Sequence, residues 1–133
     1  MGFHEISFRV RYGETDQMGV VYHGNYPQYL ELGRVQWLRS LGISYKALEE
    51  GGIILPVVSL QISYMKSIFY DDLITVRTML RKAPLVKIEL DYEIYRESHE
   101  ILAKATTVLA FMEKRTKKPI KCPEFILEKI NIP

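Results

Sequence analysis

Hydrophobic and polar positions alternate with a period of two over residues 4–12. The apolar face of this segment consists of His4, Ile6, Phe8, Val10 and Tyr12. Glutamate, serine and arginine side chains fill the other face. Because successive side chains of a β-strand point to opposite faces, this pattern predicts a strand with one buried side. Tyr12 ends the apolar face, and we expect its side chain to point inward.

The apolar period becomes helical after residue 25. The residues that share one helical face are Tyr26, Tyr29, Leu30, Gly33, Trp37, Leu38 and Leu41. Asn25 is predicted to be the N-cap with Gln28 at the capping-box position, and Gly42 to stop the helix. Gly33 weakens an isolated helix by roughly 1 kcal/mol relative to alanine, so we expect it to allow close approach to a sheet.

The remaining pattern is mostly that of strands. Four strand segments are predicted, at residues 58–64, 73–82, 86–94 and 101–112, with short helices at 44–50, capped by Ser44, and at 123–130. The segment 101–112 is apolar on both faces except for Lys104 and its threonines, as in a central strand. Because no helix separates the later strands, the sheet must be mostly antiparallel, with the long helix on one face. The sequence therefore predicts one α+β domain over residues 1–133.

Composition narrows the functional classes. The chain has 133 residues, of which 47% are hydrophobic and 26% charged, as in an ordinary soluble domain. Its formal net charge of +2 is too small to indicate nucleic acid but is compatible with an anionic ligand. Cys122 is the only cysteine, which excludes an internal disulfide. The start lacks the regions of a secretory signal, and the apolar run 53–58 is too short to insert into a membrane. We therefore expect a cytoplasmic protein.

Residues 12–26, YGETDQMGVVYHGNY, hold the groups most suited to chemistry. Asp16 stands in a polar turn, and His23 follows directly before the long helix. A carboxylate facing the start of a helix can act as a base or nucleophile, while free backbone N–H groups stabilise developing negative charge. The alternative is that Asp16 only forms a turn with an Asx-type hydrogen bond.

This segment resembles the signature of the 4-hydroxybenzoyl-CoA thioesterase-like acyl-CoA thioesterases, a branch of the hotdog-fold superfamily. In form it is most similar to the branch associated with the Tol-Pal envelope system. The matching residues are Tyr12, Glu14, Thr15, Asp16, Gly19, Val20, Val21, Tyr22, His23, Asn25 and Tyr26. The similarity continues through residues 31–42 and 67–78 and so covers nearly the whole chain. It implies a hotdog fold, in which a curled, mostly antiparallel five-stranded sheet wraps one long helix.

The resemblance implies an acyl-CoA thioesterase that hydrolyses an acyl-CoA to a free acid and CoA. Asp16 would be the general base or the nucleophile, two roles that the sequence does not separate. The backbone amides near His23 and Gly24, at the helix start that Asn25 begins, would hold the oxyanion. The His23 ring has either a catalytic or orienting role or a structural one. Tyr12 either donates its hydroxyl to Asp16 or the substrate, or is a core residue.

Other charged residues give weaker signals. Lys117 and Lys118 lie in the densest basic run, and either contact the phosphates of CoA or are solvated turn charges. Lys66 and the segment 81–87 are comparable candidates. Glu31 is expected to pair with Arg34 on the long helix. The histidines lack carboxylate or cysteine companions at ligand spacing, so we expect neither a metal nor a cofactor.

The sequence also predicts an assembly of subunits and leaves two rival functions. A single curled sheet leaves an exposed edge that a homodimer or homotetramer would cover. The resemblance adds that hotdog active sites form between subunits. The rival functions are a hotdog hydratase acting on enoyl thioesters and a non-catalytic acyl-CoA binding module.

Overall fold

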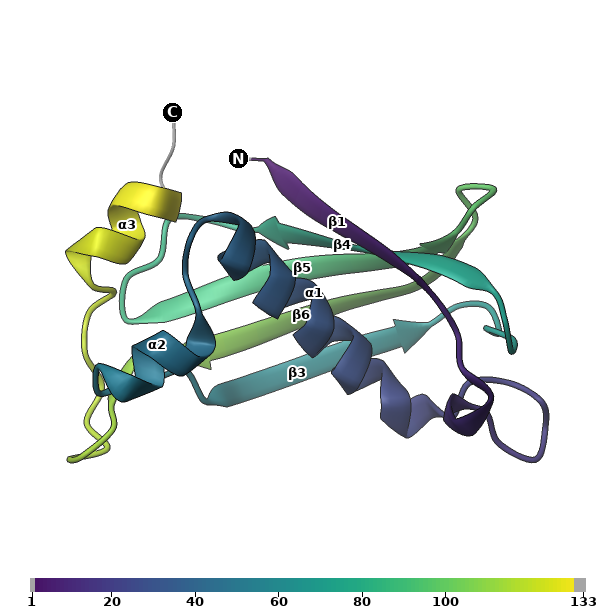
Figure 1. Ribbon diagram of the computed structural model, residues 1–133, viewed down its shortest axis with the longest axis horizontal. Coiled ribbons are helices and arrows are strands. Elements are labelled where there is room, and N and C mark those ends of the chain that lie inside the picture. The colour runs from purple at the N-terminus through teal and green to yellow at the C-terminus, as the bar shows by residue number, and fades with distance from the viewer. Residues whose placement is uncertain (1, 131–133) are drawn as a thin grey trace.

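The computed structural model describes residues 2–130, in which one helix lies across a five-stranded sheet (Figure 1). The strands, in the spatial order β1-β4-β5-β6-β3, are β1 (Phe3–Arg9), β4 (Leu73–Leu80), β5 (Lys87–Arg96), β6 (Ile101–Ala110) and β3 (Val57–Tyr64). The helices are α1 (Tyr26–Ser40), α2 (Tyr45–Glu50) and α3 (Glu124–Ile130). Every neighbouring pair of strands is antiparallel. The α+β architecture and the interior position of β6 are confirmed.

Three predicted strands are shorter than their patterns suggest, and the one expected at 73–82 ends at Leu80. The first ends at Arg9, because Val10 turns to donate its N–H to Asp72 O and the chain then forms the 3₁₀ turn η1 (Tyr12–Glu14). The last divides at the buried Phe111 into β6 and the two-residue strand β7 (Met112–Glu113). β7 pairs with β2 (Ile53–Ile54) in a small ribbon that the sequence pattern did not predict.

Tyr12 does not point inward. Its side chain is 77% exposed, and its ring meets that of Tyr70 edge-on with centroids 5.7 Å apart. The alternating pattern continued past the true end of the strand. Since η1 rotates the chain after Arg9, the period of two no longer sets the direction of Tyr12.

The core lies between α1 and the inner face of the sheet. Its fully buried members include Leu30, Ile74, Val76, Leu90, Tyr92, Ile94, Leu102 and Leu109. Burial alternates strictly along β4, which is the neighbour of the edge strand β1. β3, the opposite edge, stays largely exposed on both faces. One margin of the helix–sheet sandwich is therefore open.

Gly33 allows α1 to approach β4 closely. A Cβ added at residue 33 would lie 2.8 Å from both Thr78 Oγ1 and Val76 Cγ1. Both neighbours are completely buried, so neither has free space to move into. The predicted use of this glycine for close approach to the sheet is confirmed.

We expect Gly33→Ala to lower the free energy of unfolding by about 1–3 kcal/mol, the usual effect of overpacking a core. Helix propensity alone would favour alanine by about 1 kcal/mol, so the two effects have opposite signs. Urea unfolding followed by circular dichroism measures the difference. Gly13→Ala serves as control, because a Cβ there meets nothing within 4 Å. An unfolding free energy equal to or above that of the unmodified protein would show that the contact is not limiting.

The entrance to α1 differs from the predicted cap. The chain enters the helix through the 3₁₀ turn η2 (His23–Asn25), which gives Asn25 helical backbone angles. Asn25 is the N-cap residue by position, as predicted, but its side chain makes no capping hydrogen bond, and the predicted capping box with Gln28 is wrong. Other helix signals hold: Ser44 Oγ accepts the Ala47 N–H at 3.3 Å, and Gly42 has a φ of +81°.

The predicted Glu31–Arg34 pair is also wrong. Arg34 is only 7% exposed and donates from Nε to Tyr45 Oη at 3.2 Å. Arg34 lies on the sheet-facing side of α1, whereas Glu31 is exposed. Among residues 2–130, Arg34 forms no ion pair.

Candidate active site

The Asp16 loop is fixed to the end of the sheet by backbone hydrogen bonds. Asp16 N–H donates to Val20 O at 2.9 Å, and Gly19 N–H donates to Asp16 O at 3.0 Å. Gly19 has a φ of +81°, a conformation that favours glycine. Val21 N–H reaches Ile68 O at 2.7 Å, which ties the loop to the segment after β3. Asp16 therefore has a defined position beside the end of β3.

The Asp16 carboxylate combines the two alternatives predicted from the sequence. Its Oδ1 accepts the Met18 N–H at 2.8 Å, which is the Asx-type turn. Its Oδ2 has no hydrogen-bond partner among residues 2–130. The side chain is partly buried and lines a cavity. One oxygen thus orients the carboxylate, and the other is available to a ligand.

This cavity of about 320 Å³ is formed by the motif of the Asp16 loop and helix entrance together with a segment distant in sequence. Its lining includes Asp16 and Met18 from the loop, His23 and Tyr26 from the helix entrance, and Tyr64 and Lys66 from the end of β3. Asp16 and His23 are thus brought together, as their spacing suggested. Lys66 was a weak candidate for contacting CoA, but Tyr64 was not predicted to belong to this site, because strand periodicity does not reveal which loop a strand end will meet.

The helix entrance offers two free backbone donors. The first hydrogen bond of η2 runs from Asn25 N–H to Tyr22 O at 2.9 Å, so His23 and Gly24 precede it. Within residues 2–130, the N–H groups of His23 and Gly24 have no acceptor. A Cβ added to Gly24 would lie 2.5 Å from Tyr22 Cε2, so glycine lets the tyrosine ring pack over this turn. Free N–H groups at a helix start attract negative charge.

Aromatic rings surround His23. Its imidazole lies between the rings of Tyr22 and Tyr64, at centroid distances of 4.4 and 6.4 Å. Tyr64 Oη donates to His23 O at 3.2 Å, and the Tyr64 ring packs edge-on against Tyr26 at 4.7 Å. Burial, followed by the nearby Tyr64, raises the pKa of Tyr26 to about 12. Tyr26 is therefore a neutral phenol at physiological pH.

Glu14 holds the loop and the helix entrance together. Its Oε1 accepts hydrogen bonds from Arg11 N–H at 2.8 Å and from Tyr29 Oη at 3.0 Å. Its backbone carbonyl accepts the Tyr22 N–H at 2.9 Å and Asn25 Nδ2 at 2.8 Å. Partial burial raises the pKa of the Glu14 carboxyl, but the bonds from Arg11 and Tyr29 outweigh burial and keep the pKa below its ordinary value. Glu14 therefore caps the turn as an ionised carboxylate.

Three of the predicted residues of the motif, Tyr12, Gly24 and Asn25, are not among the residues that line the cavity. Asn25 directs its amide to Glu14 O, so its side chain connects the helix entrance to η1. Tyr12 contacts Tyr70, and no hydrogen bond joins it to Asp16 within residues 2–130. The motif therefore contains both cavity-lining residues and residues that support the loop.

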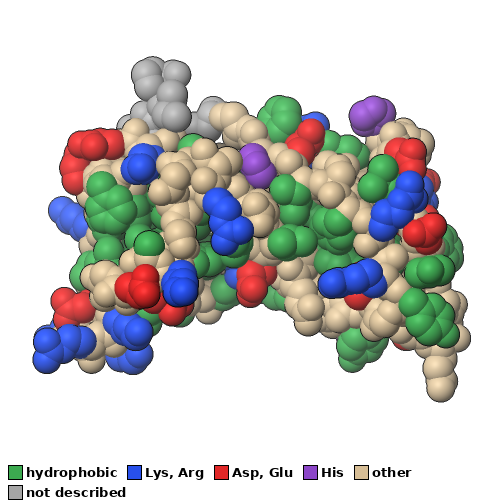
Figure 2. All heavy atoms as spheres, viewed as in Figure 1, with side chains coloured by type: hydrophobic (Ala, Val, Ile, Leu, Met, Phe, Trp, Pro, Cys, Tyr) green, Lys and Arg blue, Asp and Glu red, His purple; other side chains and the backbone are tan. Residues whose placement is uncertain are grey.

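Lys117 and Lys118 also lie away from the cavity of their own chain. They occupy the exposed turn after β7, at the opposite end of the molecule from the Asp16 loop (Figure 1). Basic side chains gather at that end of the surface (Figure 2). Lys117 has a φ of +61°, so the turn is tight as well as exposed. Within a single chain these lysines do not contribute to the cavity.

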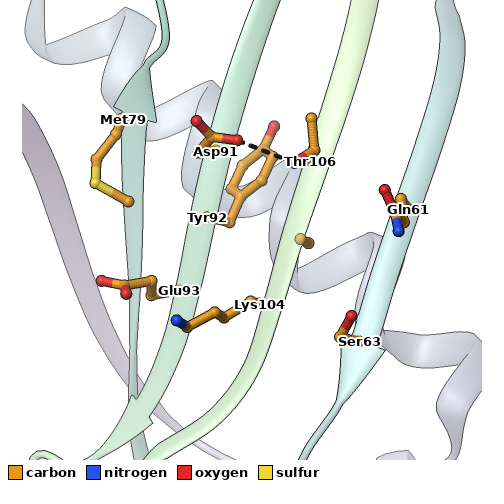
Figure 3. A pocket seen from close by; sticks show the side chains of 9 residues that line it. Gln61, Ser63, Met79, Asp91, Tyr92, Glu93, Lys104 and Thr106 are labelled. Carbon is orange, nitrogen blue, oxygen red and sulfur yellow. Dashed lines mark hydrogen bonds between the residues drawn. The ribbon is translucent and has the colours of Figure 1, made fainter.

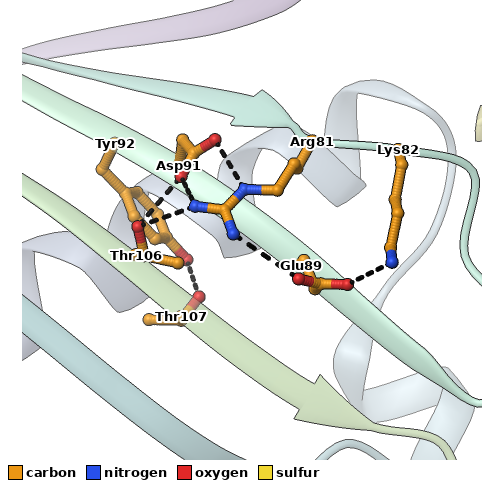
Figure 4. Close-up of polar contacts among 7 residues, drawn as sticks. All are labelled: Arg81, Lys82, Glu89, Asp91, Tyr92, Thr106 and Thr107. Carbon is orange, nitrogen blue, oxygen red and sulfur yellow. Dashed lines mark hydrogen bonds and ion pairs between the residues drawn. The ribbon is translucent and has the colours of Figure 1, made fainter.

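The other basic candidates separate into two groups. Lys66 lines the cavity, and its Nζ lies 2.7 Å from Glu100 Oε2. This hydrogen bond lowers the pKa of Glu100. Arg81 pairs with Asp91 at 2.6 Å, and Lys82 with Glu89 at 3.0 Å, on the sheet face away from α1 (Figure 4). Only Lys66 therefore places a positive charge at the cavity.

A further hollow of about 280 Å³ lies on the outer face of the sheet (Figure 3). Its polar lining includes Gln61, Ser63, Asp91, Lys104 and Thr106. The Asp91 carboxylate is already bonded to Arg81 and to Thr106 Oγ1, at 2.6 and 2.9 Å. This hollow offers no free carboxylate beside backbone donors, in contrast to the Asp16 cavity.

Residues 2–130 contain no cluster of three or more histidine, cysteine or acidic side chains placed to bind a metal ion. None of the helices in this range has the length and apolarity required to cross a membrane.

Comparisons with known proteins agree with the geometry. The model of the thioesterase-like superfamily matches residues 10–130. The chain is 39% identical over 112 residues to YneP of Bacillus subtilis, whose provisional name is acyl-CoA thioesterase, covering 84% of this chain and 81% of YneP. It is 32% identical over 117 residues to the acyl-CoA thioesterase YbgC of Haemophilus influenzae, covering 87% and 85% of the two chains.

Solved structures show the same arrangement of helix and sheet. The DHNA-CoA thioesterase of Staphylococcus aureus superposes with a TM-score of 0.86 at 39% identity, covering 90% of this chain and 80% of that one. A 1,4-dihydroxy-2-naphthoyl-CoA thioesterase from Synechocystis gives 0.89 at 25% identity, with coverage of 99% and 100%. The predicted hotdog fold is confirmed.

Proposed function

The chain belongs to the thioesterase-like superfamily, and we propose that it hydrolyses acyl-CoA thioesters in the Asp16 cavity. The observation that carries this proposal is that Asp16, whose Oδ2 has no partner among residues 2–130, lines the same cavity as His23, where the helix entrance with its free N–H groups at His23 and Gly24 begins. A base or nucleophile and an oxyanion site are the two elements that acyl transfer requires. The acyl-CoA thioesterase names of the relatives YneP and YbgC support the same substrate class.

In the proposed reaction, the thioester carbonyl oxygen accepts hydrogen bonds from the N–H groups of His23 and Gly24. Asp16 then acts in one of two ways. It attacks the acyl carbon, which breaks the C–S bond, expels CoA as a thiolate and leaves an anhydride; water then hydrolyses the anhydride, and the proton that this step releases neutralises the thiolate. Alternatively, it takes a proton from a water molecule that attacks the same carbon, and the proton passes to the CoA thiolate as the C–S bond breaks. Both routes give one carboxylic acid and one CoA, and neither uses a cofactor.

The proposed roles of the remaining motif residues follow their positions. The His23 ring, held between Tyr22 and Tyr64, orients or polarises the thioester. The exposed side chain of Tyr12 does not donate to Asp16 of the same chain. Its hydroxyl is therefore predicted to act only toward the substrate. Asn25 supports the oxyanion site indirectly, through its bond to Glu14 O.

We propose that two subunits join through their β3 edges. β3 has a strand neighbour on one side only, and its exposed positions include Val58, Leu60 and Tyr64, at 52%, 43% and 50%. An exposed edge with apolar side chains is a ready template for strand pairing. Antiparallel pairing about a two-fold axis would set the Val57 end of one β3 beside the Tyr64 end of the other. The assembly would be a homodimer, or a homotetramer of two such pairs.

This pairing gives Lys117 and Lys118 a proposed function. Their turn follows β7, which pairs with β2 just before the Val57 end of β3. In the proposed dimer, the turn of one subunit would therefore approach the cavity of the other. The lysines could then meet the phosphates of a bound CoA, together with Lys66.

We expect the double variant K117Q/K118Q to raise KM by about 2- to 10-fold, with a smaller change in kcat, because exposed ion pairs contribute about 0.2–1 kcal/mol each. The effect should shrink as salt is added. Steady-state kinetics at two ionic strengths measure it. The matched control is R81Q/K82Q, which removes two charges already paired with Asp91 and Glu89. Equal changes in KM for both double variants would remove Lys117 and Lys118 from the CoA site.

A screen for thiol release tests the function against its rivals. The purified protein is given short aliphatic, long-chain and aromatic acyl-CoAs, and free CoA is measured. The proposal predicts release with at least one class. Binding without thiol release would indicate a non-catalytic acyl-CoA module. Addition of water to an enoyl-CoA with the thioester intact would indicate a hydratase.

Two finer assignments stay proposals. The motif at residues 12–26 supports a place in the branch associated with the Tol-Pal system. The single cysteine, Cys122, is buried and unpaired, which suits a reducing compartment such as the cytoplasm.

A further inference from the structure

Arg34 is a buried cation without an anionic partner. The residue is 7% exposed, and its only hydrogen bond within residues 2–130 runs from Nε to Tyr45 Oη at 3.2 Å. The hydroxyl of Tyr92, a buried residue close to Arg34, is bonded to Thr107 Oγ1 at 2.7 Å (Figure 4). A guanidinium carries five N–H donors and stays protonated in proteins. Most of the donors of Arg34 therefore have no protein acceptor in this part of the chain.

Burial of such a residue for packing alone would lower the stability of the fold. Removing a charge from water costs several kcal/mol, and well-packed apolar residues often replace buried charges without loss of stability. The surrounding groups, Tyr45, Tyr92 and Thr107, are neutral hydroxyls rather than carboxylates. The terminal nitrogens of Arg34 are not sealed from solvent, so an oxygen-bearing ligand would replace water as their acceptor.

A row of residues on α1 leads from the candidate active site to Arg34. Tyr26 lines the Asp16 cavity, and Leu30 and Arg34 follow at intervals of four residues. Residues at this spacing lie on the same face of a helix. At a rise of 1.5 Å per residue, Tyr26 and Arg34 are separated by about 12 Å along the axis. Because helical side chains lean toward the N-terminus, the guanidinium lies closer to the cavity than this.

A matching row runs along the inner face of the sheet. Tyr64 lines the cavity, and Ile62 and Leu60 follow it on the same face of β3. Leu60 is paired with Thr107 of β6, the residue that bonds Tyr92. The distance from Tyr64 to Leu60 is about 13 Å at the rise of a strand. The helix row and the sheet row thus start at the same cavity and end at the same polar cluster.

The row is apolar, and its β3 side is exposed at the margin of the sheet. The β6 residues beside Tyr64 and Ile62 are Ala103 and Ala105, whose side chains are small. Leu60 and Tyr64 remain 43% and 50% exposed, so the helix does not cover this margin of the sheet. An acyl group extending from a thioester at Asp16 would meet apolar surface first and Arg34 at its far end.

We propose that Arg34 recognises an oxygen-bearing group, a hydroxyl or a carboxylate, at the end of the acyl chain away from the thioester. This inference rests on the proposed thioesterase function and adds the class of acyl group. Arg34 selects the substrate and takes no part in the cleavage. An acyl group with a plain hydrocarbon end would leave the guanidinium without an acceptor and bind less well.

The test uses acyl-CoAs in pairs of matched length. Each pair consists of a plain alkanoyl-CoA and either the mono-CoA ester of a dicarboxylic acid or an ω-hydroxyacyl-CoA of the same length. A hydroxylated aromatic acyl-CoA is likewise compared with its unsubstituted form. At one length, we expect kcat/KM of the unmodified protein to favour an oxygen-bearing member by about 10-fold or more, the usual effect of a hydrogen bond to a charged group. Comparing the carboxylate and the hydroxyl substrates shows which of the two groups Arg34 recognises.

Arg34→Met should bring the ratio of kcat/KM between the oxygen-bearing and the plain substrate close to one. A loss of activity common to both substrates does not affect this ratio. Arg39→Met is the matched control, because Arg39 is exposed in the last turn of the same helix, and its ratio should not change. If the unmodified protein cleaves plain acyl-CoAs but prefers no oxygen-bearing member at any length, the inference is wrong while the thioesterase function stands. That comparison does not depend on the folding of a variant. An unchanged ratio in a folded Arg34→Met protein also overturns the inference about Arg34. Absence of thiol release from every substrate would reject both this inference and the thioesterase function.

Discussion

Asp16→Asn should lower kcat by about 10²–10⁴-fold, the usual contribution of a positioned general base. Loss of a nucleophile would have a larger effect. Asparagine has nearly the same shape, and its Oδ1 can still accept the Met18 N–H that closes the turn. It can neither take a proton nor attack a carbonyl carbon. The melting temperature should therefore stay near that of the unmodified protein while thiol release falls.

Two variants act as comparisons for Asp16→Asn. Asp71→Asn makes the same chemical change at an exposed residue that does not line the cavity, and asparagine tolerates its φ of +66°. It should keep full activity. His23→Ala should be milder than Asp16→Asn, because the backbone N–H survives the substitution. A correctly folded Asp16→Asn protein with more than about a tenth of the original kcat would exclude Asp16 as a required base.

Leu60→Lys should produce a monomer with kcat/KM reduced by about 10²-fold, the scale of loss when reacting groups are misplaced by about 1 Å. Leu60 is a partly exposed apolar residue on the inner face of β3. Lysine on an edge strand opposes strand pairing, because its charge cannot be buried against a second edge. The lost subunit would remove the neighbouring turn with Lys117 and Lys118 and leave the cavity open.

Light scattering gives the mass, and thiol release gives the activity, of the same samples. Leu85→Lys is the control, since Leu85 is 73% exposed in the turn between β4 and β5. It should leave both mass and activity unchanged. A monomeric unmodified protein at micromolar concentration with full activity would reject the subunit pairing through β3.

Local patterns predicted the elements but not the points where the chain departs from them. Gly33 is an example of success, because a glycine on the apolar face of a long helix has few uses besides close packing, and Val76 and Thr78 supply that contact. Tyr12 is an example of failure. The hydrogen bond from Val10 N–H to Asp72 O ends the strand, and Asp72 lies far away in the sequence. Similarly, the tertiary bond from Asn25 Nδ2 to Glu14 O replaced the expected helix cap.

The candidate site, like the fold, was predictable where its residues share one local motif and not where it depends on contacts between distant segments. Asp16 and His23 share one motif, and the cavity brings them together. Tyr64 and Lys66 join them through contacts between segments distant along the chain, among them the bonds from Val21 N–H to Ile68 O and from Tyr64 Oη to His23 O. Arg34 was expected to pair with Glu31 since their spacing allows it. Its burial against Tyr45 depends on how α2 folds back onto α1, which side-chain spacing on one helix does not encode.

Binding of a non-hydrolysable acyl-CoA analogue to Asp16→Asn, measured by calorimetry beside the unmodified protein, tests the central claim most directly. If Asp16 reacts with the thioester rather than holding the substrate, the two Kd values should agree within about threefold, since less than about 1 kcal/mol of binding would be lost. A Kd that rises in proportion to the loss of kcat would contradict this account, because Asp16 would then be a binding residue and the chemistry would lie elsewhere.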